Sequence, residues 1–435
     1  MIRVACGERD PVEVLRRLSR GERPFLLDGA SDADGLGRFS FAGCDPIDGL
    51  VWRRGDAGRP LELLEAAARR WSAGPIDDKP WPLAVGYLAY DLGAELVARS
   101  AGRTLAARDE LGLPELDFAR YAAVWRFDRI NQHAEILALD GEAASRLLRR
   151  FERAPPPLAA PRVGAVRWGI ADADYRARVE RVLDYLRAGD CYQVNLSHRL
   201  FAPLDDDGAL PLYLRLRAAA PAPLGAYLRT GAGALVCNSP ELFLRASPSS
   251  LETRPIKGTR PRGADAERDA SLAAVLRASE KENAEHLMIV DLERNDLGRV
   301  AVTGSVHVDG YARLVTLPTL HHLVSTVRAR PRPGVGLGDL LTATFPGGSI
   351  TGAPKLRAME IIDELEGVRR GPYCGALGWL GASGHLDLAL AIRTAVVRSG
   401  ELILSVGGGI VADSLPDEEL LETRVKAEAF LRALA

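Results

Sequence analysis

The spacing of hydrophobic positions changes repeatedly along this 435-residue chain. Apolar residues three and four positions apart indicate amphipathic helices, whereas apolar residues at every second position indicate half-buried strands. The helical spacing predicts helices over residues 11–20, 61–71, 171–188, 279–292, 355–366 and 416–434. The strand pattern predicts strands over residues 24–28, 38–43, 81–90, 121–128, 134–140 and 190–197, and a hairpin over 225–229 and 234–238. Helices and strands are therefore expected in both halves of the chain.

One proline-rich stretch interrupts this pattern. Residues 154–161 read APPPLAAP, and proline continues neither a helix nor a central strand. This composition predicts a linker over residues 154–163, between an N-terminal lobe of residues 1–153 and a C-terminal region of residues 164–435. Segments that suggest chemistry are concentrated in the second region.

Charge and composition narrow the class of protein. The 56 Lys and Arg residues nearly balance the 58 Asp and Glu residues, so nothing indicates binding to nucleic acid or to an anionic membrane. No apolar run reaches the ~18–20 residues needed to span a bilayer, and the first residues lack the apolar segment of a signal peptide. The five scattered cysteines contain no CxxC pair, which is typical of reduced thiols. These features predict a soluble, cytoplasmic protein.

The segment PIKGTRPRG, residues 255–263, places Lys257 between an isoleucine and a glycine. Short predicted strands over 242–244 and 251–253 precede it, and the second would deliver Lys257 into a turn or a pocket. A desolvated lysine loses part of its affinity for a proton, and the neutral amine is a nucleophile. A solvated surface lysine is the alternative, since lysine is rarely fully buried.

Two predicted helices each carry a pair of glutamates three residues apart. Glu282 and Glu285 form one pair, and Glu419 and Glu422 form the other. This spacing places both carboxylates of a pair on one helix face. If the two helices faced each other, their oxygens would suit Mg²⁺, because no histidine or cysteine joins the set. Ordinary solvated glutamates would show the same spacing, so the pattern alone leaves both interpretations open.

Three further segments carry candidate polar groups. Arg393 lies in an apolar strand predicted over residues 388–397, where a buried guanidinium needs a carboxylate side chain or an anionic ligand. The glycine-rich residues 344–355 could offer backbone N–H groups to an anion or could form a structural turn. His321 and His322 are adjacent on a predicted strand, so at most one of them points inward.

In order along the chain, these motifs resemble the chorismate-utilising enzymes, the family of anthranilate, aminodeoxychorismate, isochorismate and salicylate synthases. The matching segments are YQVNLS, SPE, PIKGTRPRG, ENAEHLMIVDLERNDLGRV, FPGGSITGAPK, RGPYCGALGWL, AIRT, GGGIVADS and ELLETRVKA. They extend over about residues 165–432, and the N-terminal region resembles the family more weakly. The resemblance implies an α+β fold, in which two antiparallel-sheet lobes form a β-sandwich core flanked by helices.

The resemblance also implies roles for matching residues. Glu285 and Glu422 would bind Mg²⁺, with Glu282 and Glu419 beside them, and the ion would hold the ring carboxylate of chorismate. Glu241 of the SPE motif lies where the general acid for the departing 4-hydroxyl belongs. The other matching positions border the substrate: Tyr373, Arg393 and the Gly409 backbone at the enolpyruvyl carboxylate, and Thr259, His322 and Ser349 around the ring and pyruvyl group.

Two positions separate the reactions of the family. Members that use water carry a lysine base at the position of Gln193, which argues against isochorismate and salicylate synthesis here. Anthranilate synthases usually have PIAGT, and aminodeoxychorismate synthases usually have PIKGT. Lys257 is therefore expected to attack C2 of chorismate before ammonia adds at C4, giving 4-amino-4-deoxychorismate, the precursor of p-aminobenzoate and folate. Anthranilate synthesis and a catalytically silent chorismate-binding homologue are the alternatives.

The ammonia needs a source. The chain lacks the GxCxG nucleophile elbow of a glutamine amidotransferase, and Cys374 lies in PYCGA, which matches the family's own pattern. A separate glutaminase subunit is therefore expected as a partner. Where tryptophan-binding relatives have a serine after Leu26 and Leu27, this chain has Asp28, which departs from that pattern.

Overall fold

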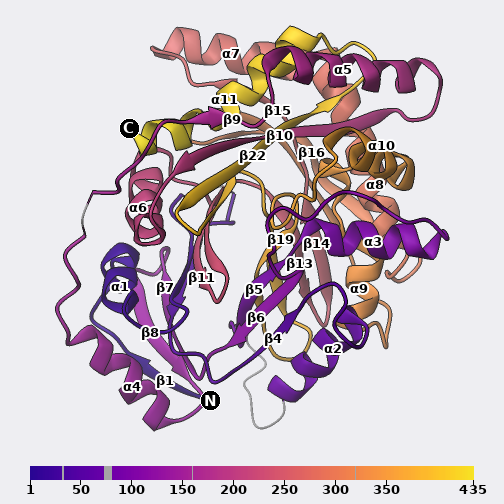
Figure 1. The fold of residues 1–435 in the computed structure, drawn as a ribbon. Helices are drawn as coiled ribbons and strands as arrows, with labels where there is room; N and C mark the ends of the chain where they lie inside the picture. The colour runs from indigo at the N-terminus through magenta and orange to yellow at the C-terminus, as the bar shows by residue number, and fades with distance from the viewer. Residues whose placement is uncertain (32–33, 73–80, 159, 319) are drawn as a thin grey trace.

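The computed structural model describes residues 1–31, 34–72, 81–158, 160–318 and 320–435. Within them, two antiparallel sheets pack face to face and helices cover their outer faces (Figure 1). The expected α+β sandwich is confirmed. The helices are α1 (Pro11–Leu18), α2 (Pro60–Trp71), α3 (Tyr90–Ser100), α4 (Gly141–Phe151), α5 (Asp172–Arg187), α6 (Ala209–Ala219), α7 (Ala266–Ala278), α8 (Glu280–Gly298), α9 (Leu337–Thr344), α10 (Lys355–Glu366) and α11 (Pro416–Leu434), with short 3-10 turns η1 (Asp206–Gly208) and η2 (Gly348–Ile350).

Both sheets combine strands from the N-terminal and C-terminal parts of the chain. The first sheet has the order β1 (Ile2–Ala5), β8 (His133–Ala138), β7 (Ala123–Asp128), β3 (Phe39–Gly43), β2 (Phe25–Asp28), β11 (Leu224–Thr230), β12 (Gly233–Ser239), β21 (Thr394–Arg398), β22 (Glu401–Ile410), β10 (Gln193–Pro203) and β18 (Gly352–Ala353), and β9 (Arg167–Trp168) pairs with β10. The second sheet has the order β15 (Ile256–Pro261), β17 (Leu320–Ala329), β14 (Ser250–Arg254), β13 (Leu242–Ser247), β20 (Leu386–Leu390), β19 (Ala376–Leu380), β5 (Ala84–Leu88), β6 (Leu116–Arg120) and β4 (Asp48–Trp52), and β16 (His307–Thr316) pairs with β17.

A hydrophobic core fills the space between the sheets. The ring of Phe41 on β3 meets the ring of Trp379 on β19 edge-on, with centroids 6.0 Å apart. Leu235 on β12 and Leu377 on β19 belong to the same buried cluster. Further buried clusters lie on the outer faces, where the apolar stripes of the helices pack on the strands.

The chain crosses between the sheets next to a candidate residue. β20 belongs to the second sheet and β21 to the first, so residues 391–393 form the crossing. Arg393 has a φ of 48°, the left-handed region. The continuous strand predicted over residues 388–397 is therefore wrong, because apolar periodicity marks burial and does not reveal that the chain changes sheets.

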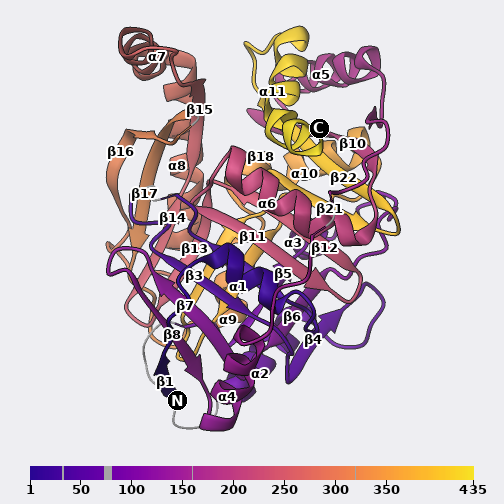
Figure 2. The same cartoon turned by 90° about the vertical axis from the view of Figure 1, so that its left-hand side faces the viewer.

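Two arms rise from the same end of the sandwich (Figure 2). The first arm consists of β15, α7 and α8, and the second consists of α5 and α11. Local sequence fixes where α8 and α11 begin. The Ser279 hydroxyl accepts a hydrogen bond from the Glu282 N–H, and Pro416 occupies the first turn of α11. The carboxylate pairs therefore lie within the first two turns of both helices.

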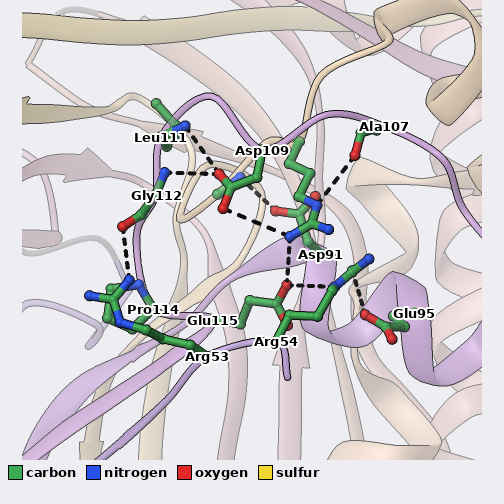
Figure 3. Close-up of polar contacts among 12 residues, drawn as sticks. Arg53, Arg54, Asp91, Glu95, Ala107, Asp109, Leu111, Gly112, Pro114 and Glu115 are labelled. Carbon is green, nitrogen blue, oxygen red and sulfur yellow. Dashed lines mark hydrogen bonds and ion pairs between the residues drawn. The ribbon is translucent and has the colours of Figure 1, made fainter. Parts of the chain in front are cut away.

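The N-terminal part of the chain contacts residues 369–371 through polar groups that are largely buried (Figure 3). Asp91 accepts hydrogen bonds from the backbone N–H groups of Arg370 and Gly371, at 3.2 and 2.7 Å. The Arg369 guanidinium pairs with Glu115 at 3.3 Å. These contacts fix the segment that leads into Tyr373. No helix in the described parts of the chain has both the length and the apolar character to cross a membrane.

Candidate active site

Lys257 lies on β15, an edge strand of the second sheet, so of the turn or pocket that the sequence suggested, the turn is wrong. The register with β17 shifts between Lys257 and Thr259, where Gly258 has a φ of 72°. Glycine adopts this conformation without steric cost. The Lys257 side chain is only 12% exposed, and its Nζ lies 3.9 Å from Glu285 Oε2. The lysine is therefore largely buried beside a carboxylate of α8.

Because Gly409 has no side chain, it leaves room for the amine of Lys257. A Cβ atom at Gly409 would lie 3.1 Å from the Lys257 Nζ and 3.1 Å from the Gln193 Nε2. Gln193 is fully buried on β10, and its two side-chain polar atoms have no hydrogen-bond partner among the described residues. A buried amide without partners is costly unless a ligand or water completes its bonds. The structure thus joins β10, β15 and β22 around one polar centre.

Glu241 is a buried carboxyl group between β12 and β13. Burial raises its pKa to about 7, although a hydrogen bond from Ser349 and the charge of Lys257 oppose the shift. The Ser349 hydroxyl, on η2, donates to Glu241 Oε1 at 2.6 Å. A carboxyl group with this pKa is partly protonated near neutral pH, as a general acid must be. The glycine-rich turn therefore supplies a side chain to the site.

His322 faces the same centre from β17. Its Nδ1 lies 3.0 Å from the Thr259 Oγ1 and 3.3 Å from the Gly258 carbonyl oxygen, which accepts only, so we assign the proton to Nδ1. Its Nε2 is buried without a partner among the described residues. Burial lowers the pKa of the imidazole to about 3. His321 points to the opposite side and contacts Asp269 at 2.9 Å, so the expectation that at most one histidine faces inward is confirmed.

Arg393 and Tyr373 complete the candidate substrate groups. The Arg393 side chain has no hydrogen bond or ion pair within the residues that the structure describes. Burial lowers the pKa of its guanidinium, and the charge of Glu241 opposes that change. Tyr373 is buried, and its ring lies 5.9 Å from the Arg370 guanidinium. Because the Arg393 guanidinium is partly removed from water and has no ion-pair partner among the described residues, an anionic ligand is expected beside it.

Each of the four expected metal-binding carboxylates has a basic neighbour. The pairs are Glu285 with Lys257 at 3.9 Å, Glu282 with Arg260 at 3.2 Å, Glu419 with Lys281 at 4.0 Å and Glu422 with Lys426 at 2.6 Å. Burial raises the pKa values of Glu285 and Glu419, and the nearby Glu422 carboxylate adds to both shifts. Lys426 holds the pKa of Glu422 below its usual value. Carboxylates of α8 and α11 are therefore within electrostatic range of each other.

The donor groups fit a hard divalent cation, although they are not assembled around one. Among the described residues, no three His, Cys, Asp or Glu side chains form a ready-made metal cluster. Glycines leave room beside both pairs: a Cβ atom at Gly408 would lie 3.2 Å from Glu419 Oε2, and one at Gly258 would lie 3.2 Å from Glu282 Oε2. Oxygen-only donors suit Mg²⁺.

The buried ion pair between Arg370 and Glu366, next to the candidate site, was not recognised in the sequence. Arg370 and Glu366 bond to each other at 2.7 and 2.9 Å, and Arg370 also donates to the carbonyl oxygens of Ile350 and Asn195. Glu366 accepts from both the N–H and the hydroxyl of Ser197. The pair thus fixes β10 relative to the turn that carries Ser349. An acid and a base four residues apart were the available signal, but the helix ends between them, so helical spacing does not apply.

Asp28 lies away from this centre, in the lining of a cavity of about 450 Å³ between the sheets. Its carboxylate accepts hydrogen bonds from Ser40, Tyr213 and Arg217. The residue that departs from the family's tryptophan-binding pattern is therefore engaged by the protein itself.

Known proteins resemble this chain both in sequence and in structure. The model of the family described as chorismate binding enzyme matches residues 32–432. Aminodeoxychorismate synthase component 1 of Escherichia coli is 39% identical over 378 residues, covering 86% of this chain and 82% of the relative. Anthranilate synthase component 1 of Streptomyces coelicolor is 40% identical over 438 residues, covering 95% of this chain and 84% of the relative. The crystal structure of anthranilate synthase component I from Streptococcus pneumoniae superposes with a TM-score of 0.78, at 31% identity, covering 90% of this chain and 92% of that one.

Proposed function

The chain belongs to the chorismate-binding enzymes, and from this premise we propose that it aminates chorismate at C4 to give 4-amino-4-deoxychorismate. Relatives that make this product and relatives that make anthranilate are equally similar to it, so overall similarity does not choose between them. The observation that carries the proposal is the position of Lys257. Its amine is largely buried and lies against Gly409 and Gln193, at the centre of the candidate site.

The proposed reaction uses Lys257 and Glu241 in two steps. The neutral amine of Lys257 forms a bond to C2 of chorismate while the C4 hydroxyl leaves as water, taking its proton from Glu241. Ammonia then forms a bond to C4, the C2–nitrogen bond to Lys257 breaks, and the excess proton of the new ammonium group returns to Glu241. Nucleophilic catalysis divides one difficult displacement into two easier ones, and protonation removes the poor leaving group.

The other site residues would bind and orient the substrate. Arg393 and Tyr373, with the backbone at Gly409, would receive the enolpyruvyl carboxylate. Thr259 holds His322 in one orientation at the ring, and Ser349 holds the acid Glu241. The carboxylates of Glu282, Glu285, Glu419 and Glu422 would hold Mg²⁺, which when bound neutralises the ring carboxylate and makes the ring more electrophilic.

Ammonia would come from a separate glutaminase subunit. Both curated relatives are named component 1, which supports an enzyme of more than one component. The product would serve the synthesis of p-aminobenzoate and folate.

A product assay tests this proposal. The purified chain is incubated with chorismate, Mg²⁺ and ammonium, and the products are separated by chromatography. Formation of 4-amino-4-deoxychorismate is expected. Anthranilate as the main product would contradict the proposal, and no turnover would favour a silent chorismate-binding homologue.

The lysine role has its own test. Without ammonium, mass spectrometry of the intact wild-type chain should detect a covalent adduct, and Lys257→Ala should lack it. This variant should also lose most of the 4-amino product, and residual turnover should shift towards anthranilate. Arg294→Met, which removes an exposed basic side chain from α8, is the control and should keep both adduct and product. An undiminished rate of 4-amino product in Lys257→Ala would exclude a covalent role.

A further inference from the structure

One of the four basic neighbours spans the two arms. Lys281 belongs to α8 in the first arm, and its Nζ lies 4.0 Å from an oxygen of Glu419 on α11 in the second arm. The partners of Glu282 and Glu422 lie within the same arm as the carboxylate they neutralise. Lys281 therefore holds a positive charge between the two arms, where their carboxylates face each other.

The charge of Lys281 acts on more than one carboxylate. It lowers the pKa values of Glu285, Glu419 and Glu422 alike. Lys281 is one turn before Glu285 on α8, so both side chains project from the same helix face. Its ammonium group is thus within electrostatic range of three of the four carboxylates to which we assign Mg²⁺.

Of the four basic groups beside these carboxylates, Lys281 is the one that can move away into solvent most easily. Its side chain is 40% exposed, whereas Lys257 is 12% exposed and Lys426 donates a second bond to the Gly407 carbonyl oxygen at 2.7 Å. Arg260 is likewise held by a bond to the Thr259 carbonyl oxygen. A flexible lysine stem can carry its charge into solvent without disturbing the helix.

We propose that the Lys281 ammonium group occupies the space between the carboxylates of α8 and α11 while no divalent cation is bound, and that a divalent cation displaces it. The inference rests on the proposed Mg²⁺ site. Four carboxylates and four basic groups balance each other in the structure as it stands. Exchange of one ammonium group for a divalent ion raises the net charge of the centre by one unit, which favours a dicarboxylate such as chorismate.

The test measures metal binding and not activity. Mg²⁺ is titrated into the full chain by calorimetry, and Mn²⁺ is titrated in parallel with detection of the free ion by electron paramagnetic resonance. Lys281→Met should bind either cation about tenfold more tightly than wild type, because a competing charge is removed. Lys281→Arg retains the charge and should bind as wild type does. Arg294→Met removes a positive charge from the distant end of the same helix and should leave the affinity unchanged.

The outcomes separate the two proposals. If wild type binds the cation and Lys281→Met binds it equally or more weakly, the displacement of Lys281 is excluded and the metal site stands. If neither protein binds a divalent cation, the metal site is excluded and the inference with it. Lys281→Gln replaces Lys281→Met if the latter does not fold. In either variant, added Mg²⁺ should raise the melting temperature by more than it does in wild type.

Discussion

Two arginines, the buried Arg370 and the half-buried Arg393, show how the scaffold around this candidate site differs from the site itself. Arg370 bonds to both carboxylate oxygens of Glu366 and to two backbone carbonyl oxygens, and its guanidinium carbon lies 4.6 Å from the Tyr90 ring. Arg393 has no such partner among the described residues. The same contrast holds for Gln193, whose buried side-chain amide has no hydrogen-bond partner in the part of the chain that the structure describes. The charge of Arg370 is satisfied by the protein and belongs to the scaffold, whereas Arg393 and Gln193 are groups that we propose to receive a ligand.

The largest expected effect concerns the acid at the centre. Glu241→Gln removes the proton that leaves with the C4 hydroxyl, so kcat for ammonia-dependent turnover should fall by about 10³-fold. Steady-state kinetics with ammonium measures this. Glu293→Gln is a matched control, because Glu293 is also buried, and burial together with Glu241 raises its pKa well above the usual value. Gln there keeps the size and the hydrogen-bonding oxygen of the side chain, and it should cost little because Glu293 has no assigned role in the reaction. A loss below tenfold in Glu241→Gln would remove the acid role.

Substitution of Arg370 and substitution of Arg393 should affect different properties, the first stability and the second substrate binding. Arg370→Met leaves the Glu366 carboxylate buried without its partner and should lower the free energy of unfolding by about 3–5 kcal/mol. Arg393→Met removes no partner from the protein, so its stability should be close to wild type, while KM for chorismate should rise by about 10- to 100-fold. Denaturant unfolding and kinetics on both variants check this. Equal losses of stability would show that Arg393 belongs to the scaffold too.

The smallest effect is a shift in a pH profile. Glu241 must be protonated to act, so kcat/KM should fall as the pH rises through about 7. The Ser349 hydroxyl stabilises the carboxylate and lowers this pKa. Ser349→Ala should therefore move the falling limb upward by less than one pH unit. Ser145→Ala, which removes a surface hydroxyl on α4, should not move it. A downward shift in Ser349→Ala would contradict the assignment.

Several helices and strands could be predicted from the local spacing of apolar residues and from the positions of proline and glycine. Proline at the start of α11 and apolar spacing along it predicted residues 416–434, which are the bounds observed. The glycine-rich residues before α10 were recognised as a turn, but their serine could not be placed beside Glu241, because the two are 108 residues apart. The strand around Arg393 was predicted without its crossing, since burial on both sides of residues 391–393 continues the apolar pattern.

The sequence by itself determined the family, the identity of the chemical groups and many helix and strand positions, because these depend on residue type and on spacing over a few residues. Only the tertiary structure decided which groups meet. It buried Lys257 against Gly409, gave each glutamate of the candidate metal site its own basic neighbour, and left the side chains of Gln193 and Arg393 without hydrogen-bond partners among the described residues. Those outcomes depend on contacts between residues far apart in the chain, and on desolvation that no local pattern contains.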